Sequence, residues 1–261
     1  MNNSDIVKNI VKSSAPFLEN KTVTDIVIGI SLIACQLDDG SVGVSYVLRH
    51  GLPPGCSAFA YAKNAVGCLA SEIAPWLLEK DDYIGRSIGS AVLSAASRQI
   101  DIPDDNKDGK MFGIDFNSED TVGMIGLIGP VAKQLKDKVK NIIVFDQSIS
   151  AFGDNVTVYP MQQQPLLLPK CSKLIVTGSS TINGSIDGIL DMCKNAQEIA
   201  VVGSSTPMFA DGWSNTNVTS LCGSWWDNSH KDEIFKIISC GGGIMELQPY
   251  MIKKALYIKN K

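Results

Sequence analysis

Three short segments rich in glycine, serine and threonine each follow an apolar run, and their residue types are suited to binding a ligand. Backbone N–H groups and hydroxyls in such loops can donate hydrogen bonds to an anion. Ligands of open α/β sheets bind beyond the carboxyl ends of the strands, so we expect these loops to share one crevice. The candidate ligand-binding residues are Gly126, Gly129, Thr177, Gly178, Ser179, Asn183, Gly203, Ser204, Ser205 and Thr206. Taken singly, each segment could instead serve only as a turn and a helix cap.

The segment Thr121–Asp146 has the order expected of a strand, a glycine turn, a helix, a second strand and an acid. This order is typical of a Rossmann-like βαβ unit, in which the acid accepts hydrogen bonds from a ribose. Asp146 follows Gly126 by 20 residues, as that role requires. The glycines at 123, 126 and 129 do not form G-x-G-x-x-G, however. The sequence therefore predicts the βαβ unit more strongly than a bound dinucleotide.

Residues that could hold a metal ion or an anion lie in the first half of the chain as well. His50 stands six residues before Cys56, in a loop rich in proline and glycine. With Asp146 they are candidate ligands of a divalent transition metal, since cysteine suits soft ions and a carboxylate suits harder ones. A loop histidine near a buried thiol is the alternative. Arg86 could bind an anionic group from the helix predicted over Tyr83–Ile100, although a solvated arginine is the simpler expectation.

Composition narrows the classes of function. The 261 residues carry a net charge of −4, so the chain lacks the basic surface expected of a nucleic-acid-binding protein. Its apolar runs are shorter than the roughly 20 residues that span a bilayer, and the N-terminal region lacks a signal-peptide core. We therefore expect a cytoplasmic protein without membrane insertion. The seven scattered cysteines contain no C-x-x-C and do not indicate a disulfide framework. The sequence leaves open whether the chain forms a homo-oligomer.

The order of predicted elements indicates an α/β protein with two domains. Residues 1–105 begin with a helix over 4–19, continue into the β-rich run Val23–Cys35, and return through the turn Asp38–Gly40. The polar stretch after Ile100 is the best domain boundary. Further predictions are a helix over Ala62–Glu79 that is broken near Pro75, a cap at Asp81 or Asp82 for the helix Tyr83–Ile100, a crossing loop over Pro160–Pro169, and a helix over Ile182–Cys193. Beyond it, strands alternate with helices, which predicts a mainly parallel sheet covered on both faces over residues 106–261.

These motifs resemble a family named for heavy-metal chelation. The matching stretches are RSIGSAVLSAAS (Arg86–Ser97), VGMIGLIGPV (Val122–Val131), VTGSSTINGS (Val176–Ser185) and VVGSSTPMFADGW (Val201–Trp213). The resemblance implies a small domain similar to the enolase N-terminal domain, followed by a Rossmann-like domain. Ser94 stands where the family often has asparagine, and Asp146 where it often has glutamate. The resemblance implies handling of a metal or metal complex, and it carries over no catalytic residue.

Three hypotheses of function follow. The first is binding of a heavy-metal ion or a metal complex, a small ligand, in the crevice between the domains. The second is an enzyme with a nucleotide-like cofactor such as S-adenosylmethionine, held by the turn at Gly126–Gly129 with Asp146 on the ribose. The third is a non-catalytic interaction subunit, which an exposed apolar face around Trp213, Trp225 and Trp226 would favour. The sequence does not decide whether the protein is an enzyme.

Overall fold

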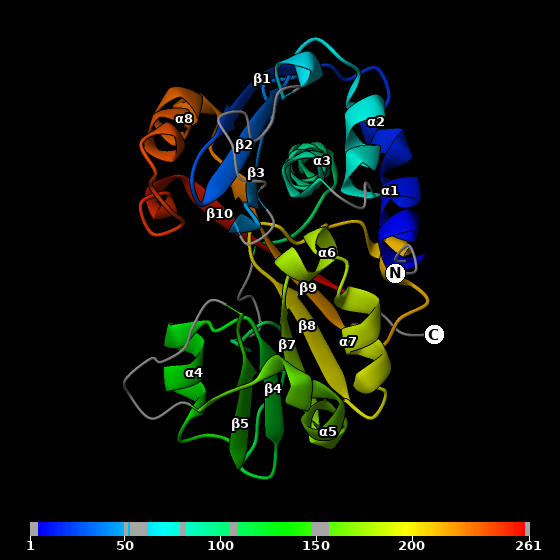
Figure 1. Ribbon diagram of the computed structural model, residues 1–261, viewed down its shortest axis with the longest axis vertical. Helices are drawn as coiled ribbons and strands as arrows, with labels where there is room; N and C mark the ends of the chain where they lie inside the picture. Colours follow the sequence, from blue (N-terminus) through cyan, green and yellow to red (C-terminus); the bar gives the residue numbers. More distant parts are fainter. Residues whose placement is uncertain are drawn as a thin grey trace.

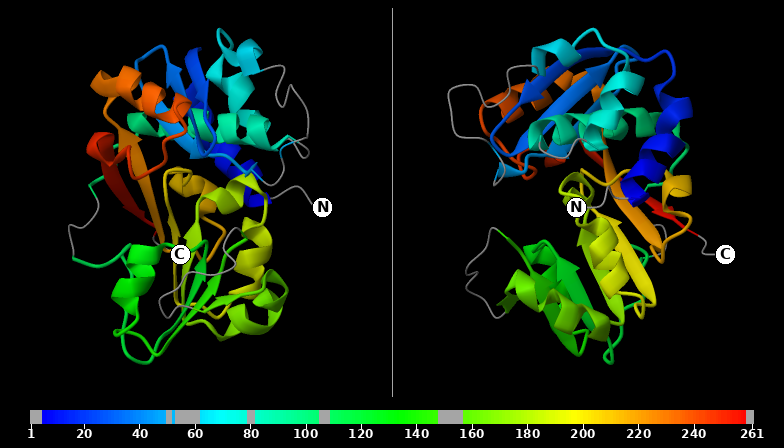
Figure 2. Two further views of the ribbon diagram at one scale, coloured as in Figure 1. Left: turned by 60° about the vertical axis from the view of Figure 1, so that its left-hand side comes forward. Right: turned by 45° about the vertical axis from the view of Figure 1, so that its right-hand side comes forward.

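The computed structural model describes residues 5–49, 52, 62–78, 82–104, 109–147 and 157–258, which form two sheets with helices around them (Figure 1). The small sheet is antiparallel, with the order β1-β2-β3, and the large sheet has seven strands. Figure 2 shows the same arrangement from two further directions, with the small sheet and its helices at the top and the large sheet below. The predicted α/β class is confirmed.

The small sheet is built from β1 (Val23–Ile28), β2 (Leu32–Leu37) and β3 (Val42–Tyr46), and α1 (Asp5–Leu18) precedes it. The β-rich run predicted over Val23–Cys35 forms two strands in place of one, because the chain turns between β1 and β2. A Cβ added at Gly29, in that turn, would lie 2.3 Å from the carbonyl oxygen of Ile238. The glycine therefore allows a helix from the second half of the chain to approach the turn closely.

The helix α3 (Tyr83–Ala96) lies against β2 and β3. The side chain of Asp82 accepts hydrogen bonds from the backbone N–H groups of Ile84 and Gly85, each at 3.0 Å, and so caps the helix. Three short pieces replace the helix predicted over Ala62–Glu79: η2 (Ala62–Ala65), α2 (Ala70–Ile73) and η3 (Ala74–Leu78). Gly89 lets α3 pack closely on η3, since an added Cβ would lie 2.6 Å from the Leu77 nitrogen.

The large sheet has the strand order β10-β9-β8-β7-β4-β5-β6. Its strands are β4 (Thr121–Ile125), β5 (Asn141–Phe145), β6 (Val158–Tyr159), β7 (Lys173–Thr177), β8 (Glu198–Val202), β9 (Ser220–Trp226) and β10 (Met251–Tyr257). The first six are parallel, and β10 is antiparallel to β9. Numbered in chain order, the parallel strands run 3-2-1-4-5-6, the order of doubly wound dinucleotide-binding sheets.

The α-helices of the second half are α4 (Gly129–Leu135), α5 (Gln164–Leu167), α6 (Ser179–Ile182), α7 (Ile186–Met192) and α8 (Lys231–Ser239). Its 3₁₀ segments are η5 (Met161–Gln163), η6 (Leu168–Lys170), η7 (Ala210–Trp213), η8 (Asn228–His230) and η9 (Gln248–Tyr250). A further 3₁₀ segment, η4 (Ser97–Gln99), follows α3. The one helix predicted over Ile182–Cys193 is interrupted at residues 183–185. The predicted crossing loop near residue 165 is instead a run of short helical turns.

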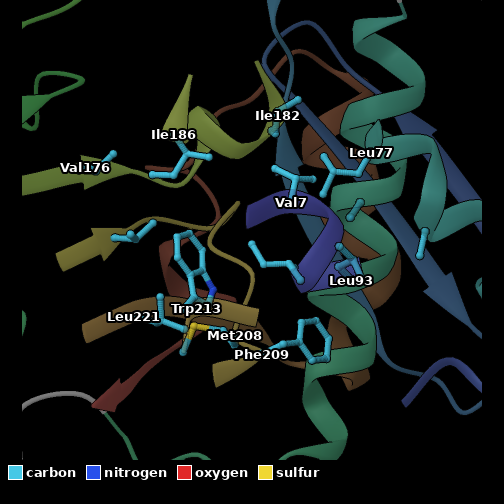
Figure 3. Close-up of a cluster of buried hydrophobic side chains, with 14 of the residues drawn as sticks. Val7, Leu77, Leu93, Val176, Ile182, Ile186, Met208, Phe209, Trp213 and Leu221 are labelled. Carbon is cyan, nitrogen blue, oxygen red and sulfur yellow. The ribbon is translucent and has the colours of Figure 1, made fainter. Parts of the chain in front are cut away.

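Packing joins the two halves. Figure 3 shows Val7 of α1, Leu93 of α3 and Ile182 of α6 gathered in one buried cluster with Trp213. On the opposite face of the small sheet, α8 packs on β1 and β2 and shares a core with Trp226. The division between residues 105 and 106 therefore stays a prediction, since α8 follows it in the chain yet covers the first sheet. Among the described residues, we find no helix with the length and apolarity needed to cross a membrane.

Candidate functional site

The carboxyl ends of β7 and β8 lie close to α3 and β3, and we call this place the Arg86 junction. Its residues are Arg86, Gly178, Ser180, Gly184, Ser205 and Thr206. In Figure 1, α6 lies directly below α3, which agrees with the contacts between the two helices. The Oγ atom of Ser205 accepts a hydrogen bond of 2.8 Å from the backbone N–H of Tyr46, so the loop after β8 is attached to β3.

The loops after β7 and β8 touch at Gly178. Its backbone N–H donates to the carbonyl oxygen of Val202 at 2.7 Å. A Cβ added at Gly178 would lie 2.5 Å from the nitrogen of Thr206, so a larger residue would push the loops apart. The glycine in this predicted loop therefore serves a close approach of two backbones, as well as a turn.

Gly184 brings the helical segment after β7 to Arg86. It has a φ of +73°, a left-handed conformation that ends α6 and favours glycine. A Cβ added there would lie 3.1 Å from the Nη2 atom of Arg86. The interruption between α6 and α7 therefore makes room for a guanidinium that comes from the other half of the chain.

The Arg86 side chain is a buried cation for which the described residues supply no carboxylate partner. The residue is 9% exposed, and its Nε has no hydrogen-bond partner among those residues. Burial lowers the pKa of its guanidinium, and among the described residues no carboxylate offsets this effect. The ring of Tyr83, with its centroid 6.0 Å from Cζ, is the one aromatic face that it contacts there. An arginine stays protonated at neutral pH, and an unpaired buried charge is costly, so such a group is a candidate binding residue.

Two buried hydroxyls at the same junction also lack partners. Ser180 is 1% exposed and Thr206 is 3% exposed, and neither hydroxyl forms a hydrogen bond within the described part of the chain. Most buried polar groups in proteins are hydrogen-bonded, so each exception needs an explanation. Sequence reasoning includes Thr206 among the candidates but does not single out Ser180, although that residue lies inside the predicted loop. Only its burial without a partner distinguishes Ser180 from its neighbours.

Other predicted residues of the β7 loop have local partners. The hydroxyls of Thr177 and Ser179 lie 3.1 Å apart and share a hydrogen bond. The side-chain oxygen of Asn183 accepts from the backbone N–H of Ser185 at 2.9 Å, which helps the chain enter α7. After β8, Gly203 has a φ of +112° and its N–H donates to Cys222, while Ser204 follows it in the turn. These contacts support the turn-forming roles that the sequence also allowed.

The glycine turn after β4 lies beside the same strand ends. Gly126 has a φ of +82°, and a Cβ added there would lie 3.0 Å from Cβ of Thr177. A carboxylate oxygen of Asp146 accepts a hydrogen bond of 2.8 Å from the N–H of Leu127. Asp146 therefore fastens the turn to the end of β5. Gly129 begins α4 with open space around its Cα, so α4 does not require a glycine there.

The structure does not test whether the three predicted metal ligands come together. His50 and Cys56 lie outside the described residues, and Asp146 has the contact given above. Within the part of the chain that the structure describes, no group of three or more His, Cys, Asp or Glu side chains is arranged to hold a metal ion. The described donors at the Arg86 junction are hydroxyls, amides and a guanidinium, which suit an anion and do not suit a bare cation.

The tryptophans do not form the exposed apolar face that an interaction subunit would favour. Trp213 and Trp226 are fully buried, and Trp225 is half-buried within β9. The indole N–H of Trp213 donates to the carbonyl oxygen of Pro207 at 3.1 Å. The guanidinium of Arg98 and the ammonium of Lys254 lie over the Trp225 ring. These rings belong to the core and its edge because β9 runs through Trp226.

Comparisons with known proteins match both halves. Two family models, each described as "Putative heavy-metal chelation", match residues 11–97 and 110–257. An uncharacterised protein from Methanocaldococcus jannaschii is 27% identical over 144 residues, and the match covers 53% of this chain and 55% of that protein. The chain thus spans about half the length of that curated relative.

Two solved structures share the fold. A protein of unknown function from Pyrococcus horikoshii has a TM-score of 0.78 and 21% identity, covering 97% of this chain and 100% of its own. A second, from Desulfitobacterium hafniense, has a TM-score of 0.75 and 17% identity, covering 96% and 98%. Both are titled as members of one family of unknown function, and at these identities they establish the fold alone.

Proposed function

Because this chain belongs to the family described as "Putative heavy-metal chelation", we propose that it binds a heavy metal as a complex with an anionic chelator, between α3 and the carboxyl ends of β7 and β8. The family description supports the metal. The donor set of the Arg86 junction supports the anionic complex.

The observation that carries this proposal is a set of three buried polar groups without partners among the described residues: Nε of Arg86 on α3, and the hydroxyls of Ser180 and Thr206 on the segments that follow β7 and β8. All three groups can donate hydrogen bonds, and the guanidinium is positively charged. A bare divalent cation would be repelled there. A chelate with outward-facing carboxylate oxygens would be attracted.

In this proposal the chelator supplies most of the metal ligands, and the protein recognises the outer oxygens of the complex. Transition metals accept carboxylate and nitrogen ligands from small chelators by the same preferences as from side chains. His50 and Cys56 remain candidate direct ligands that could complete the coordination. Thus metal and anion each contribute, and the complex binds more tightly than either part.

Isothermal titration of the tag-free full-length protein with Ni²⁺ alone, citrate alone and the 1:1 Ni²⁺–citrate complex tests the proposal. We expect the complex to bind at least about tenfold more tightly than Ni²⁺ alone, since hydrogen bonds to charged groups contribute that much. Co²⁺, Zn²⁺ and Fe²⁺ in the same series would rank the metals.

The matched variants are His50→Ala and Cys56→Ala, singly and together. We expect them to weaken binding of the complex less than they weaken binding of Ni²⁺ alone. Tight binding of Ni²⁺ alone that disappears in the double variant, with no gain from citrate, would show a bare-ion site and overturn the proposal.

A nucleotide-like cofactor is the second candidate, favoured by the 3-2-1-4-5-6 strand order and by Asp146 at the end of the second strand. Thermal unfolding with and without S-adenosylmethionine, in wild type and Asp146→Asn, tests it. Stabilisation lost in the variant supports this reading. Because Asp146 also fastens the glycine turn, melting of both proteins without ligand is the necessary control.

A further inference from the structure

We propose that the Arg86 junction is an oxyanion subsite that receives one carboxylate or phosphate group of the ligand. This proposal deepens the proposed function and rests on it for the remainder of the ligand. The subsite consists of the Arg86 guanidinium, the Ser180 hydroxyl and the Thr206 hydroxyl.

Arg86 differs from the other buried basic side chains of the protein. Among the described residues, three basic side chains are buried: Arg86, Lys173 and Lys254. Lys173 forms an ion pair with Glu198. Lys254 pairs with Asp104 at 2.7 Å and donates to the carbonyl oxygen of Ile102 at 3.0 Å. Arg86 is thus the one of the three without a carboxylate from the described residues.

The surroundings of Arg86 fix where its charge lies. Its helix is capped by Asp82, which uses its carboxylate on the backbone N–H groups of Ile84 and Gly85. Gly184 leaves room beside Nη2, with an added Cβ 3.1 Å away. The guanidinium is therefore held between α3 and the α6–α7 turn, and α6 carries Ser180.

The two hydroxyls lie on segments that meet at Gly178. Ser180 lies in α6, which follows Gly178 directly, and the Cβ that Gly178 lacks would contact the backbone of Ser205 and Thr206 in the loop after β8. A planar guanidinium binds two oxygens of one oxyanion, and neighbouring hydroxyls can donate to it as well. Carboxylate and phosphate share this chemistry, and the test below distinguishes them.

The experiment measures thermal stabilisation of the full-length protein by sodium citrate and, separately, by sodium phosphate, both without metal. The variants are Arg86→Gln and Arg86→Lys, with Arg98→Gln as the matched control, because Arg98 lies over the Trp225 ring instead. We expect at least one anion to stabilise wild type and Arg98→Gln. We expect about tenfold weaker binding or more in Arg86→Gln, and an intermediate loss in Arg86→Lys, which keeps the charge without the fork.

Folding is checked by melting each variant without anion. Removing an unpaired buried charge should leave Arg86→Gln at least as stable as wild type. Should that variant fail to fold, Thr206→Val serves in its place, since it removes one proposed donor at nearly constant volume. A response to citrate alone assigns the subsite to carboxylates, and a response to phosphate alone assigns it to phosphates.

The outcomes separate this inference from the proposed function. Anion binding that depends on Arg86 but gains nothing from Ni²⁺ supports the subsite and contradicts metal-complex binding. Binding of Ni²⁺–citrate that is equal in wild type and Arg86→Gln supports binding of the metal complex by other residues and overturns the subsite. Absence of stabilisation of wild type by both anions at millimolar concentration overturns the subsite also.

Discussion

The two ends of the large sheet differ in whether their buried polar groups are hydrogen-bonded. At the amino end, Asp120 accepts hydrogen bonds from the Ser172 hydroxyl at 2.7 Å and from the Asn117 N–H at 2.9 Å, and Lys173 pairs with Glu198. At the carboxyl end, the Arg86 junction buries a guanidinium nitrogen and two hydroxyls that have no partner among the residues the structure describes. Asp120 and Lys173 at one end and Arg86, Ser180 and Thr206 at the other are all buried, so the difference lies in whether these polar groups are hydrogen-bonded.

This difference separates a stabilising end from a binding end. Buried polar groups that satisfy one another specify the structure, because each unpaired group has a desolvation cost. Groups left unsatisfied lower stability, and binding sites commonly contain them. The carboxyl end of a parallel sheet is also where ligands bind in open α/β proteins. The predictions below test the comparison, in order of decreasing effect.

The largest effect is expected at the amino end. Lys173→Met leaves Glu198 without its ion-pair partner, and we expect the free energy of unfolding to fall by about 1–3 kcal/mol. Urea denaturation measures the change. Lys194→Met is the control, because Lys194 and its partner Asp191 are both mostly exposed, and we expect no measurable change there. Equal losses in the two variants would contradict a special role for the buried pair.

The stability of the protein at alkaline pH should depend on a second group near the amino end, the buried thiol of Cys171. Burial raises the pKa of the Cys171 thiol to about 11, from an ordinary value of 9.0. The raised pKa means that the thiol favours the folded state fully below about pH 9, and that this contribution is lost as pH rises toward 11. Cys171→Ala should therefore reduce the loss of unfolding free energy by up to about 1.4 kcal/mol per pH unit in this window.

Denaturation of wild type and variant between pH 8 and pH 11 measures that slope. Cys240→Ala is the matched control, because Cys240 is exposed and its solvation changes little on unfolding. Identical slopes in wild type and Cys171→Ala would show that the thiol ionises as readily in the folded protein. Burial of Cys171 would then have no linkage to stability.

The smallest change in stability is expected on removing a single hydroxyl, and one hydroxyl from each end is compared. Thr206→Val removes an unpaired buried hydroxyl, and we expect stability without ligand to be unchanged or to rise by up to about 1 kcal/mol. Ser172→Ala removes a donor to Asp120, and we expect a loss of about 1 kcal/mol. Urea denaturation of both variants gives the comparison. A larger loss in Thr206→Val than in Ser172→Ala would reverse our assignment of the two ends.

The elements that local sequence defines were predicted well. The βαβ unit follows from two apolar runs on either side of a glycine turn and a helix, and β4, α4 and β5 form as expected. Asp82 was one of two predicted caps for α3, and its carboxylate caps that helix. Such features depend on contacts between residues close in sequence, so a single chain segment contains the information.

Predictions failed where distant segments meet. The run Val23–Cys35 divides at a turn where α8, some 200 positions later in the chain, approaches Gly29. The helix expected over Ile182–Cys193 is interrupted at Gly184, beside the Arg86 guanidinium. Trp226 is buried because β9 extends through it and α8 covers it. In each case a tertiary contact overrides the local preference for helix, strand or loop.

By itself, the sequence determined the α/β class, the family and the loops in which a ligand would be sought. Periodicity, glycine turns and small polar residues after strands are local signals, and they suffice for these conclusions. Tertiary structure alone decided which of these polar groups are satisfied. Thr177 and Ser179 have the same residue types as Thr206 and Ser180, yet only the latter pair is buried without partners. Hydrogen bonding and desolvation depend on neighbours from other parts of the chain. Only the fold brings Arg86 to the segments that carry those two hydroxyls.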